Sequence, residues 1–403
     1  MQATDLGTTT RLKTPGGKAH NRGVRGDCHT GKRMSKLEEC EANLAAVEAD
    51  LAAARDAGDS ERASVLQALV GSGGSLLVYE PEQHHHAVLF GDLATAHHVA
   101  IVVPGVGDEA NLRDDWLPAA TNLFKAAGNA AVILWKGYDN PSDLLRATVT
   151  SAECDEGVMA AGSELAEFVR SLPLRAEQTL TIVAHSFGSI VTGSALADHD
   201  LHCTDVVVAG SPGMTVDGLR QLHLQESHFF SEEAPGDTVA ELGIFGAAPT
   251  SPKFGGTRMR TNAPGHVEVM AHSSYFVPGS EALENIVDVV TGRYSGVLAR
   301  RPTLPETVGG FVAWTIRLPT VPVRVVGRRY RGPGFRLLID SVRLVDLGAA
   351  QTGNLVRGAL DESETAIRWV GRRGWPGRRN SSRRQRGSAS RSARPRRGRD
   401  RRA

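Results

Sequence analysis

The sequence predicts an α/β fold: a mostly parallel sheet of eight strands with helices on both of its faces. From His98 to Val290, strand-like and helical patterns alternate along the chain. One apolar strand runs into a tight turn that carries Ser186 and opens a helix, and an earlier strand ends in a Pro-Gly turn. Alternation of this kind is typical of parallel sheets covered on both faces.

The chain before this alternating region predicts a helical pair and a hairpin. Ser35 to Val70 has apolar residues at helical spacing, interrupted at Gly58-Asp59, which indicates two helices. Two short strands follow, Leu76 to Glu80 and Ala87 to Phe90, and their spacing favours an antiparallel hairpin. The connection between them carries His84-His85-His86, which we expect to form an exposed turn rather than a metal site.

The alternating region supplies the remaining elements. The other predicted strands are His98 to Val103, Ala130 to Trp135, Thr179 into the serine turn, Val206 to Ala209, Leu224 to Phe230 and Arg258 to Arg260. The predicted helices are Trp116 to Ala127, Val158 to Arg170, the segment after Ser186, and Ser280 to Val290.

The turn around Ser186 carries the strongest chemical signal. Small residues, Ala184 and Gly188, lie on both sides of the serine, so the chain can bend sharply and bring the helix close to the sheet. Such a turn lifts the hydroxyl clear of the backbone and aims the helix N-terminus at the reacting group. The turn resembles the G-x-S-x-G nucleophile elbow of alpha/beta hydrolases, with Ala184 in place of the first glycine.

Further phrases make this resemblance more specific. They are similar to an alpha/beta-hydrolase family of unknown physiological substrate, found largely in high-GC bacteria, and the resemblance covers roughly residues 36 to 300. It implies the alpha/beta-hydrolase fold and leaves the substrate open. The phrases are Leu77-Val-Tyr-Glu-Pro81, Val102-Val-Pro-Gly-Val-Gly107, Leu134-Trp-Lys-Gly-Tyr-Asp139, Ala184-His-Ser-Phe-Gly188, Gly210-Ser-Pro-Gly213 and Ala271-His-Ser-Ser-Tyr-Phe276.

Chain order guides the choice of the acid. In this fold the acid and the base follow the serine in that order. The acid usually comes just after the seventh strand, which favours Asp237 because it follows a Pro-Gly turn there. Glu232 and Glu233 are competing acids nearer the strand end, and Asp217 is a weaker candidate.

The base is predicted among two histidines that follow the acid. We favour His272, which precedes the turn into the last helix, and keep His266 as the alternative. His272 would take the proton from Ser186 and return it to the leaving group. His185, next to the nucleophile, is expected to face the opposite way and to be structural.

Backbone donors and pocket residues complete the predicted site. The N–H of Phe187 is one expected oxyanion donor, and Val106 or Gly105 is the other. Tyr138 and Asp139 follow the fourth strand at the sheet's carboxyl edge and are candidates to line the substrate pocket. We expect no cofactor and no metal ion.

The expected function is a serine hydrolase with an acyl-enzyme intermediate, acting on a carboxylic ester. Ser211 to Leu222 is too short for a helical lid, so an open cleft would suit a modest ester, thioester, amide or lipid-like small molecule. The alternative is a non-catalytic protein that uses the same fold as a binding or docking module.

Composition indicates the cellular environment in which this domain is expected to work. No apolar run is long enough for a transmembrane helix, and residues 1–33 lack the apolar core of a secretory signal. The four cysteines form no C-x-x-C pair, which favours reduced thiols in a cytoplasmic protein.

Charge is unevenly distributed along the chain. Residues 371–403 carry fourteen arginines and one acid, a net charge of +13, whereas the whole chain carries +1, so the rest carries −12. This Arg-rich tail can bind polyanions electrostatically, and no specific nucleic-acid module accompanies it. The predicted organisation is a disordered segment 1–34, helices 35–72, a catalytic domain 73–300, an extension 301–370 of uncertain structure and a disordered tail 371–403.

Overall fold

The computed structural model describes the helical pair, the sheet and parts of the C-terminal extension. The described residues are 36–105, 116–139, 151–241, 243, 245–270, 272–301, 303, 308, 311–313, 315–316, 345 and 348–360. The predicted disordered segments 1–34 and 371–403 lie outside these residues. None of the described helices is long and apolar enough to cross a membrane.

Eight strands form one sheet, as predicted, in the order β1-β2-β4-β3-β5-β6-β7-β8. The predicted antiparallel hairpin of β1 and β2 is present; β2 also pairs antiparallel with β4, and all later pairs are parallel. The strands are β1 Ser75–Glu80, β2 His85–Phe90, β3 His98–Val103, β4 Ala130–Lys136, β5 Thr179–His185, β6 Asp205–Ala209, β7 Phe229–Glu232 and β8 Thr257–Arg258.

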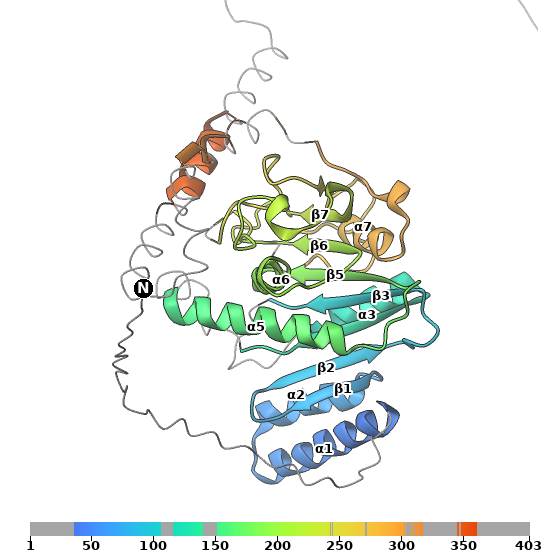
Figure 1. The fold of residues 1–403 in the computed structure, drawn as a ribbon. Helices are drawn as coiled ribbons and strands as arrows, with labels where there is room; N and C mark the ends of the chain where they lie inside the picture. Colours follow the sequence, from blue (N-terminus) through green and yellow to red (C-terminus); the bar gives the residue numbers. More distant parts are fainter. Residues whose placement is uncertain are drawn as a thin grey trace, which may run out of the picture.

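Helices cover both faces of the sheet (Figure 1). One face carries α5 and α6, whose apolar side chains share a core with every second residue of the central strands. The other face carries α1, α2, α3 and α7, which form the second core with the alternate residues. The helices are α1 Lys36–Asp56, α2 Ser60–Gly71, α3 Trp116–Ala127, α5 Ser151–Ser171, α6 Phe187–Asp198 and α7 Glu281–Val290.

The central strands are apolar throughout because both of their faces are covered. Ile101 on β3 and Ile182 on β5 point into one core, while Val102 and Val183 point into the other, and all four are fully buried. Each such side chain contributes about 1.5–3 kcal/mol through removal from water. This rigid centre fixes the ends of β3, β5 and β6, where the candidate site lies.

Several segments differ from the predicted boundaries. The helix α5 begins at Ser151 and not at Val158, and β8 is Thr257–Arg258 and not Arg258 to Arg260. The seventh strand begins at Phe229, later than the predicted Leu224, because the polar stretch Glu226–His228 forms a 3-10 turn, and it extends through Glu232.

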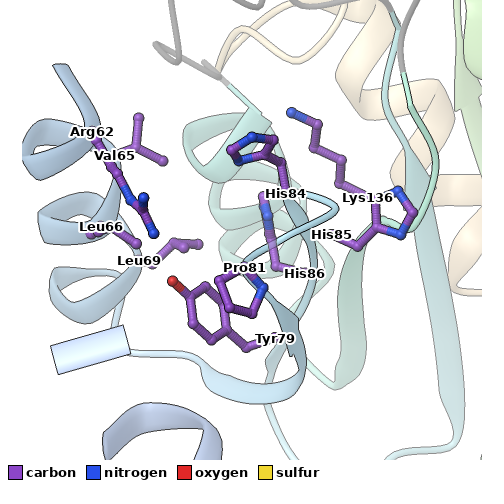
Figure 2. Close-up of a pocket in the computed structure, with 10 residues that line it drawn as sticks. All are labelled: Arg62, Val65, Leu66, Leu69, Tyr79, Pro81, His84, His85, His86 and Lys136. Carbon is purple, nitrogen blue, oxygen red and sulfur yellow. The ribbon is translucent and has the colours of Figure 1, made fainter. Parts of the chain in front are cut away.

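The three histidines do not form an exposed turn. Only His84 has turn geometry (φ 54°), whereas His85 and His86 begin β2 and are buried, and all three line a small cavity beside α2 (Figure 2). Their burial follows from pairing with β1 and β4 on either side.

The termini of the described chain pack onto the sheet domain. On the N-terminal side, Tyr79 on β1 donates a hydrogen bond of 2.6 Å to Asp50 on α1. On the C-terminal side, residues 348–360 are helical, and Arg357 pairs with Glu241 and, at 3.7 Å, with Glu233. The helix of residues 348–360 therefore contacts the loop that follows β7.

Candidate active site

The turn between β5 and α6 holds Ser186 in an unusual backbone conformation. Its φ of 50° and ψ of −122° lie in a region that non-glycine residues rarely adopt, and the side chain is 2% exposed. The Ser186 N–H donates a 3.1 Å hydrogen bond to the carbonyl of Ala209 at the end of β6. The sharp turn predicted from the sequence is therefore present, anchored to the neighbouring strand.

Gly188 explains why the helix can begin so close to the sheet. A Cβ atom at this position would lie 2.3 Å from the carbonyl oxygen of Val103 and 2.4 Å from that of Pro104. Any side chain would push α6 away from the end of β3. On the other side of the serine, Ala184 is fully buried, so a small side chain occupies the position where the motif has a glycine.

Asp237 and His272 are in direct contact. His272 Nδ1 lies 2.8 Å from Oδ1 and 2.9 Å from Oδ2 of Asp237, so the imidazole donates to the carboxylate. The Asp237 side chain is fully buried, whereas that of His272 is 25% exposed. This arrangement fixes the tautomer of His272 and leaves its Nε2 as the proton acceptor.

Several donors hold the Asp237 carboxylate in its charged form. Tyr275 donates a 2.6 Å hydrogen bond to Oδ2, and the backbone N–H groups of Val239 and Ala240 donate to Oδ1. Burial disfavours the charge, but the hydrogen bonds from His272 and Tyr275 outweigh it and lower the pKa of Asp237 below its usual value. Tyr275 was not selected from the sequence, although it follows His272 by three positions.

The nucleophile turn and the Asp237–His272 pair meet at the ends of β5 and β6. A Cβ atom at Gly210, next to the Ala209 carbonyl that holds Ser186, would lie 2.8 Å from Asp237 Oδ2 and 3.0 Å from His272 Nδ1. His272 Nε2 is buried and has no hydrogen-bond partner among the described residues. Catalytic hydrogen bonds are often long before substrate binds, and a nitrogen with an open acceptor site suits a serine hydroxyl.

His185 takes part in this site, contrary to the expectation that it faces away. Its Nε2 lies 2.5 Å from the backbone carbonyl of His272, and because a carbonyl only accepts, this nitrogen carries the proton. Its ring packs against those of His272 and Trp116, with centroid distances of 4.6 and 4.8 Å. Burial and the neighbouring His272 lower the pKa of His185 to about 3, so the ring is neutral. Sequence spacing gave no signal for this contact, which joins residues 87 positions apart.

The expected oxyanion donors lie in suitable elements. Phe187 is the first residue of α6, so its N–H has no partner within the helix. Gly105 lies against Ser186, since a Cβ there would be 3.3 Å from Ser186 Oγ. Val106, the other expected donor, lies outside the described residues.

Tyr138 and Asp139, the candidate pocket residues, lie in two different environments. Tyr138 is 2% exposed, donates a hydrogen bond to the Pro104 carbonyl and packs its ring 6.0 Å from that of Phe187. It therefore supports the two segments that carry the expected oxyanion donors. Asp139 is exposed on the surface, with Oδ1 3.5 Å from His85 Nε2.

The alternative acids and base lie in other environments. Glu232 is buried beside Glu281, and Glu233 pairs with Arg258 at 3.5 Å. His266 lies 3.0 Å from Glu284 on α7 and not in the Asp237 contact. Among the described residues, Asp237 is thus the predicted acid that contacts a predicted base, His272.

Comparison with known proteins identifies the family to which the chain is similar. The family described as alpha/beta hydrolase matches residues 80–247. The uncharacterized protein Rv0963c of Mycobacterium tuberculosis H37Rv is 31% identical over 190 residues, which cover 42% of this chain and 69% of the relative. The uncharacterized protein Rv2079 of the same strain is 28% identical over 295 residues, which cover 62% of this chain and 44% of the relative. This chain thus spans less than half the length of that second relative.

Solved structures show more distant likenesses. A 2,6-dihydroxy-pseudo-oxynicotine hydrolase is 11% identical with a TM-score of 0.32, covering 68% of this chain and 92% of its own. A lipase/esterase from Lactobacillus plantarum is 11% identical with a TM-score of 0.26, covering 40% of this chain and 78% of its own.

Proposed function

We propose that this chain, which belongs to the alpha/beta hydrolase family, is a serine hydrolase that cleaves carboxylic esters through an acyl-enzyme intermediate. The observation that carries the proposal is the Asp237–His272 contact of 2.8 Å next to the strained serine turn. A buried carboxylate that orients an imidazole, whose other nitrogen accepts a proton, is the arrangement that activates a hydroxyl nucleophile.

The proposed reaction has two halves. Ser186 Oγ attacks the ester carbonyl while His272 Nε2 takes the hydroxyl proton, and the oxyanion is held by the backbone N–H of Phe187 and by that of Gly105 or Val106. The C–O bond to the alcohol then breaks, and His272 returns the proton to the leaving alcohol. Water then attacks the acyl carbonyl while His272 Nε2 takes its proton; the bond between the acyl carbon and Ser186 Oγ breaks, His272 returns the proton to Oγ, and the carboxylic acid leaves.

The segment between β6 and β7 bears on the size of the substrate. This segment does not form a lid, because its apolar side chains are packed into the core against the sheet. The buried residues are Met214, Val216, Leu219 and Leu222. We therefore propose a small ester, with a thioester or amide as the variants to compare.

A probe and a substrate panel test the proposal together. A fluorophosphonate should label the full chain at Ser186, and p-nitrophenyl esters of graded chain length should be hydrolysed. Ser186→Ala should abolish both labelling and hydrolysis without lowering the unfolding temperature. Ser163→Ala, a half-exposed serine on α5, serves as the matched control and should leave both unchanged. Absence of labelling in the folded wild-type chain would instead favour a non-catalytic binding protein.

A further inference from the structure

The peptide unit that joins Ser186 to Phe187 connects two groups of the proposed reaction. Ser186 bears the hydroxyl that would attack the ester, and the N–H of the unit belongs to Phe187, an expected oxyanion donor. A peptide unit is planar and almost always trans, so its C=O and its N–H point in opposite directions. A contact that fixes the direction of the Ser186 carbonyl therefore also fixes the direction of the Phe187 N–H.

The Ser186 carbonyl accepts two hydrogen bonds from one residue, Ser189 on α6. The backbone N–H of Ser189 donates at 3.0 Å, and its hydroxyl donates at 2.5 Å. The first bond is ordinary for the opening turn of a helix. The second comes from a fully buried side chain, which adds a second restraint on rotation of the peptide unit.

A second buried serine, in the turn after β6, supports this hydroxyl. Ser211 Oγ lies 2.6 Å from Ser189 Oγ and accepts a 3.2 Å hydrogen bond from the Gly213 N–H. Because each hydroxyl has one proton to donate, we assign the direction from Gly213 to Ser211, from Ser211 to Ser189, and from there to the Ser186 carbonyl. The Gly213 carbonyl is a competing acceptor, but it lies farther from the two hydroxyls, at 3.1 and 3.2 Å.

The end of β6 and the turn after it thus hold Ser186 on both sides. Its N–H donates to the Ala209 carbonyl at 3.1 Å, and its own carbonyl is held through Ser189 and Ser211. The φ of 50° and ψ of −122° are strained for a serine, and such a conformation persists only where its surroundings impose it. The two serine hydroxyls are part of those surroundings.

We propose that Ser189, supported by Ser211, is a positioning residue that aims the Phe187 N–H at the oxyanion, a role that rests on the proposed hydrolase function. An oxyanion donor is effective only if it already points at the place where the charge develops. A hydrogen bond to the carbonyl of a peptide unit also polarises its N–H and strengthens it as a donor. Because the Ser189 hydroxyl contacts no reacting atom, its loss should affect the transition state more than substrate binding.

Kinetics of the full chain test this role. Ser189→Ala should lower kcat for p-nitrophenyl esters about tenfold with little change in KM, a smaller effect than the loss of about 10²–10³-fold when an oxyanion donor is removed altogether. An alkyl trifluoromethyl ketone, which forms a charged tetrahedral adduct with a reactive serine, should bind more weakly by a similar factor.

Ser194→Ala is the matched control. Ser194 is another buried serine of α6, but its hydroxyl lies 3.5 Å from Met159 Sδ and not against the Ser186 carbonyl. Its replacement should leave kcat and the affinity for the ketone unchanged. Circular dichroism establishes that each variant folds.

Nuclear magnetic resonance follows the peptide unit without any hydrolysis. Phe187 is the one phenylalanine of the chain that follows a serine, so carbonyl-¹³C serine and ¹⁵N phenylalanine together select a single amide signal. This signal should move in Ser189→Ala and stay in place in Ser194→Ala. Ser211→Ala removes the support but keeps the Ser189 hydroxyl. It should move the signal less, and it provides the test if Ser189→Ala does not fold.

The two measurements separate this role from the proposed function. An active wild type whose Ser189→Ala variant keeps both its kcat and its Phe187 signal would overturn the positioning role and leave the hydrolase function standing. Equal effects of Ser189→Ala and Ser194→Ala would also overturn it, because any lost hydroxyl in α6 would then have the same consequence. An inactive wild type would overturn the hydrolase function, while the Phe187 signal would still decide whether Ser189 fixes the peptide unit.

Discussion

At the residue scale, the burial of Asp237 decides what the site can do. A carboxylate with a fully buried side chain is costly unless it is paired, and here His272, Tyr275 and two backbone N–H groups satisfy it. These donors also leave the carboxylate little freedom to move. The charge is therefore held where it can stabilise an imidazolium at His272.

Replacing Asp237 with asparagine should lower kcat for ester hydrolysis by about 10⁴-fold, the loss known when a triad acid becomes an amide. The amide side chain can no longer hold His272 in the productive tautomer or stabilise its charge. Steady-state kinetics with p-nitrophenyl esters measure the effect. Glu233→Gln alters the competing acid, whose partner is Arg258, and is expected to keep kcat within a few-fold. Equal losses in the two variants would reassign the acid.

His185 offers a second test at this scale, because it holds the His272 carbonyl and touches no reacting atom. His185→Phe keeps a ring but loses the N–H, and should lower kcat roughly tenfold or more while KM changes little. His185→Gln places an amide N–H near the same point and should recover part of the loss. If glutamine and phenylalanine variants behave alike, the hydrogen bond to His272 has no positioning role.

The sequence was informative about residues whose proposed roles follow from chain order. Ser186, Asp237 and His272 could be selected because each follows a strand whose place in the sheet is predictable. Tyr275 and His185 could not be selected in this way. Their contacts depend on how the loop before α7 folds back over the end of β5, and no local pattern encodes that path.

At the scale of elements, the close approach of α6 to β3 positions Ser186, the proposed nucleophile. Gly188→Ala should lower the free energy of unfolding by about 1–3 kcal/mol, because the new methyl overlaps the carbonyls of Val103 and Pro104. Urea denaturation measures the loss. Gly157→Ala on α5 is the matched control: nothing lies within 4 Å of its Cβ position, so it should stabilise by roughly 0.5–1 kcal/mol. A neutral Gly188→Ala would mean that α6 adjusts freely.

The contact between β7 and α7 predicts a pH-dependent stability. Glu232 is 1% exposed, and burial followed by the charge of Glu281 raises its pKa well above the usual value. The unfolded chain releases this proton near pH 4.3, whereas the folded protein retains it to higher pH. Stability is therefore lost as the pH rises from the unfolded pKa to the folded one.

Glu232→Gln should remove this loss. Its unfolding temperature should match that of wild type near pH 4.5 and exceed it increasingly toward pH 8, because the amide never ionises. Thermal unfolding followed by circular dichroism at several pH values provides the comparison. A constant difference between the two proteins across this range would show that Glu232 does not change its charge there.

Some element boundaries could be predicted from the sequence and others could not. The buried parallel strands β3 and β4 could be predicted because they are apolar on both faces. The start of β2 could not, since His85 and His86 look polar in the sequence and are buried only by pairing with β1 and β4. The start of β7 was misplaced for the opposite reason: Leu224 looks strand-like but precedes a 3-10 turn.

At the scale of the whole molecule, segments that precede and follow the sheet in the sequence both pack onto it. The N-terminal helices cover the β1–β2 edge, and the helix of residues 348–360 contacts the loop after β7 (Figure 1). The predicted binding of polyanions by residues 371–403 stays a prediction, because these residues lie outside the described structure. The domain boundary near Arg300 stays a proposal as well.

A chain spanning Ser35 to Arg300 tests that boundary. We expect it to fold and to keep its hydrolase activity, because Asp237, His272 and the serine turn draw their described contacts from within this range. Removal of the helix of residues 348–360 takes away the Arg357 contact with Glu241 and the hydrogen bond from Asn354 to the Glu241 carbonyl. An ion pair of this partly exposed kind contributes about 1 kcal/mol or less, so Tm should fall by only a few degrees.

Arg357→Met in the full chain is the matched variant for this truncation. It removes the ion pair but keeps the helix, so its Tm should fall between those of the full chain and the truncated chain. The loop that carries Glu241 also carries Asp237, whose backbone carbonyl accepts a 3.3 Å hydrogen bond from the Glu241 N–H. Unfolding of the truncated chain would place the C-terminal helix within the core. A folded but inactive truncated chain, together with an inactive Arg357→Met, would instead show that this helix holds the acid loop in place.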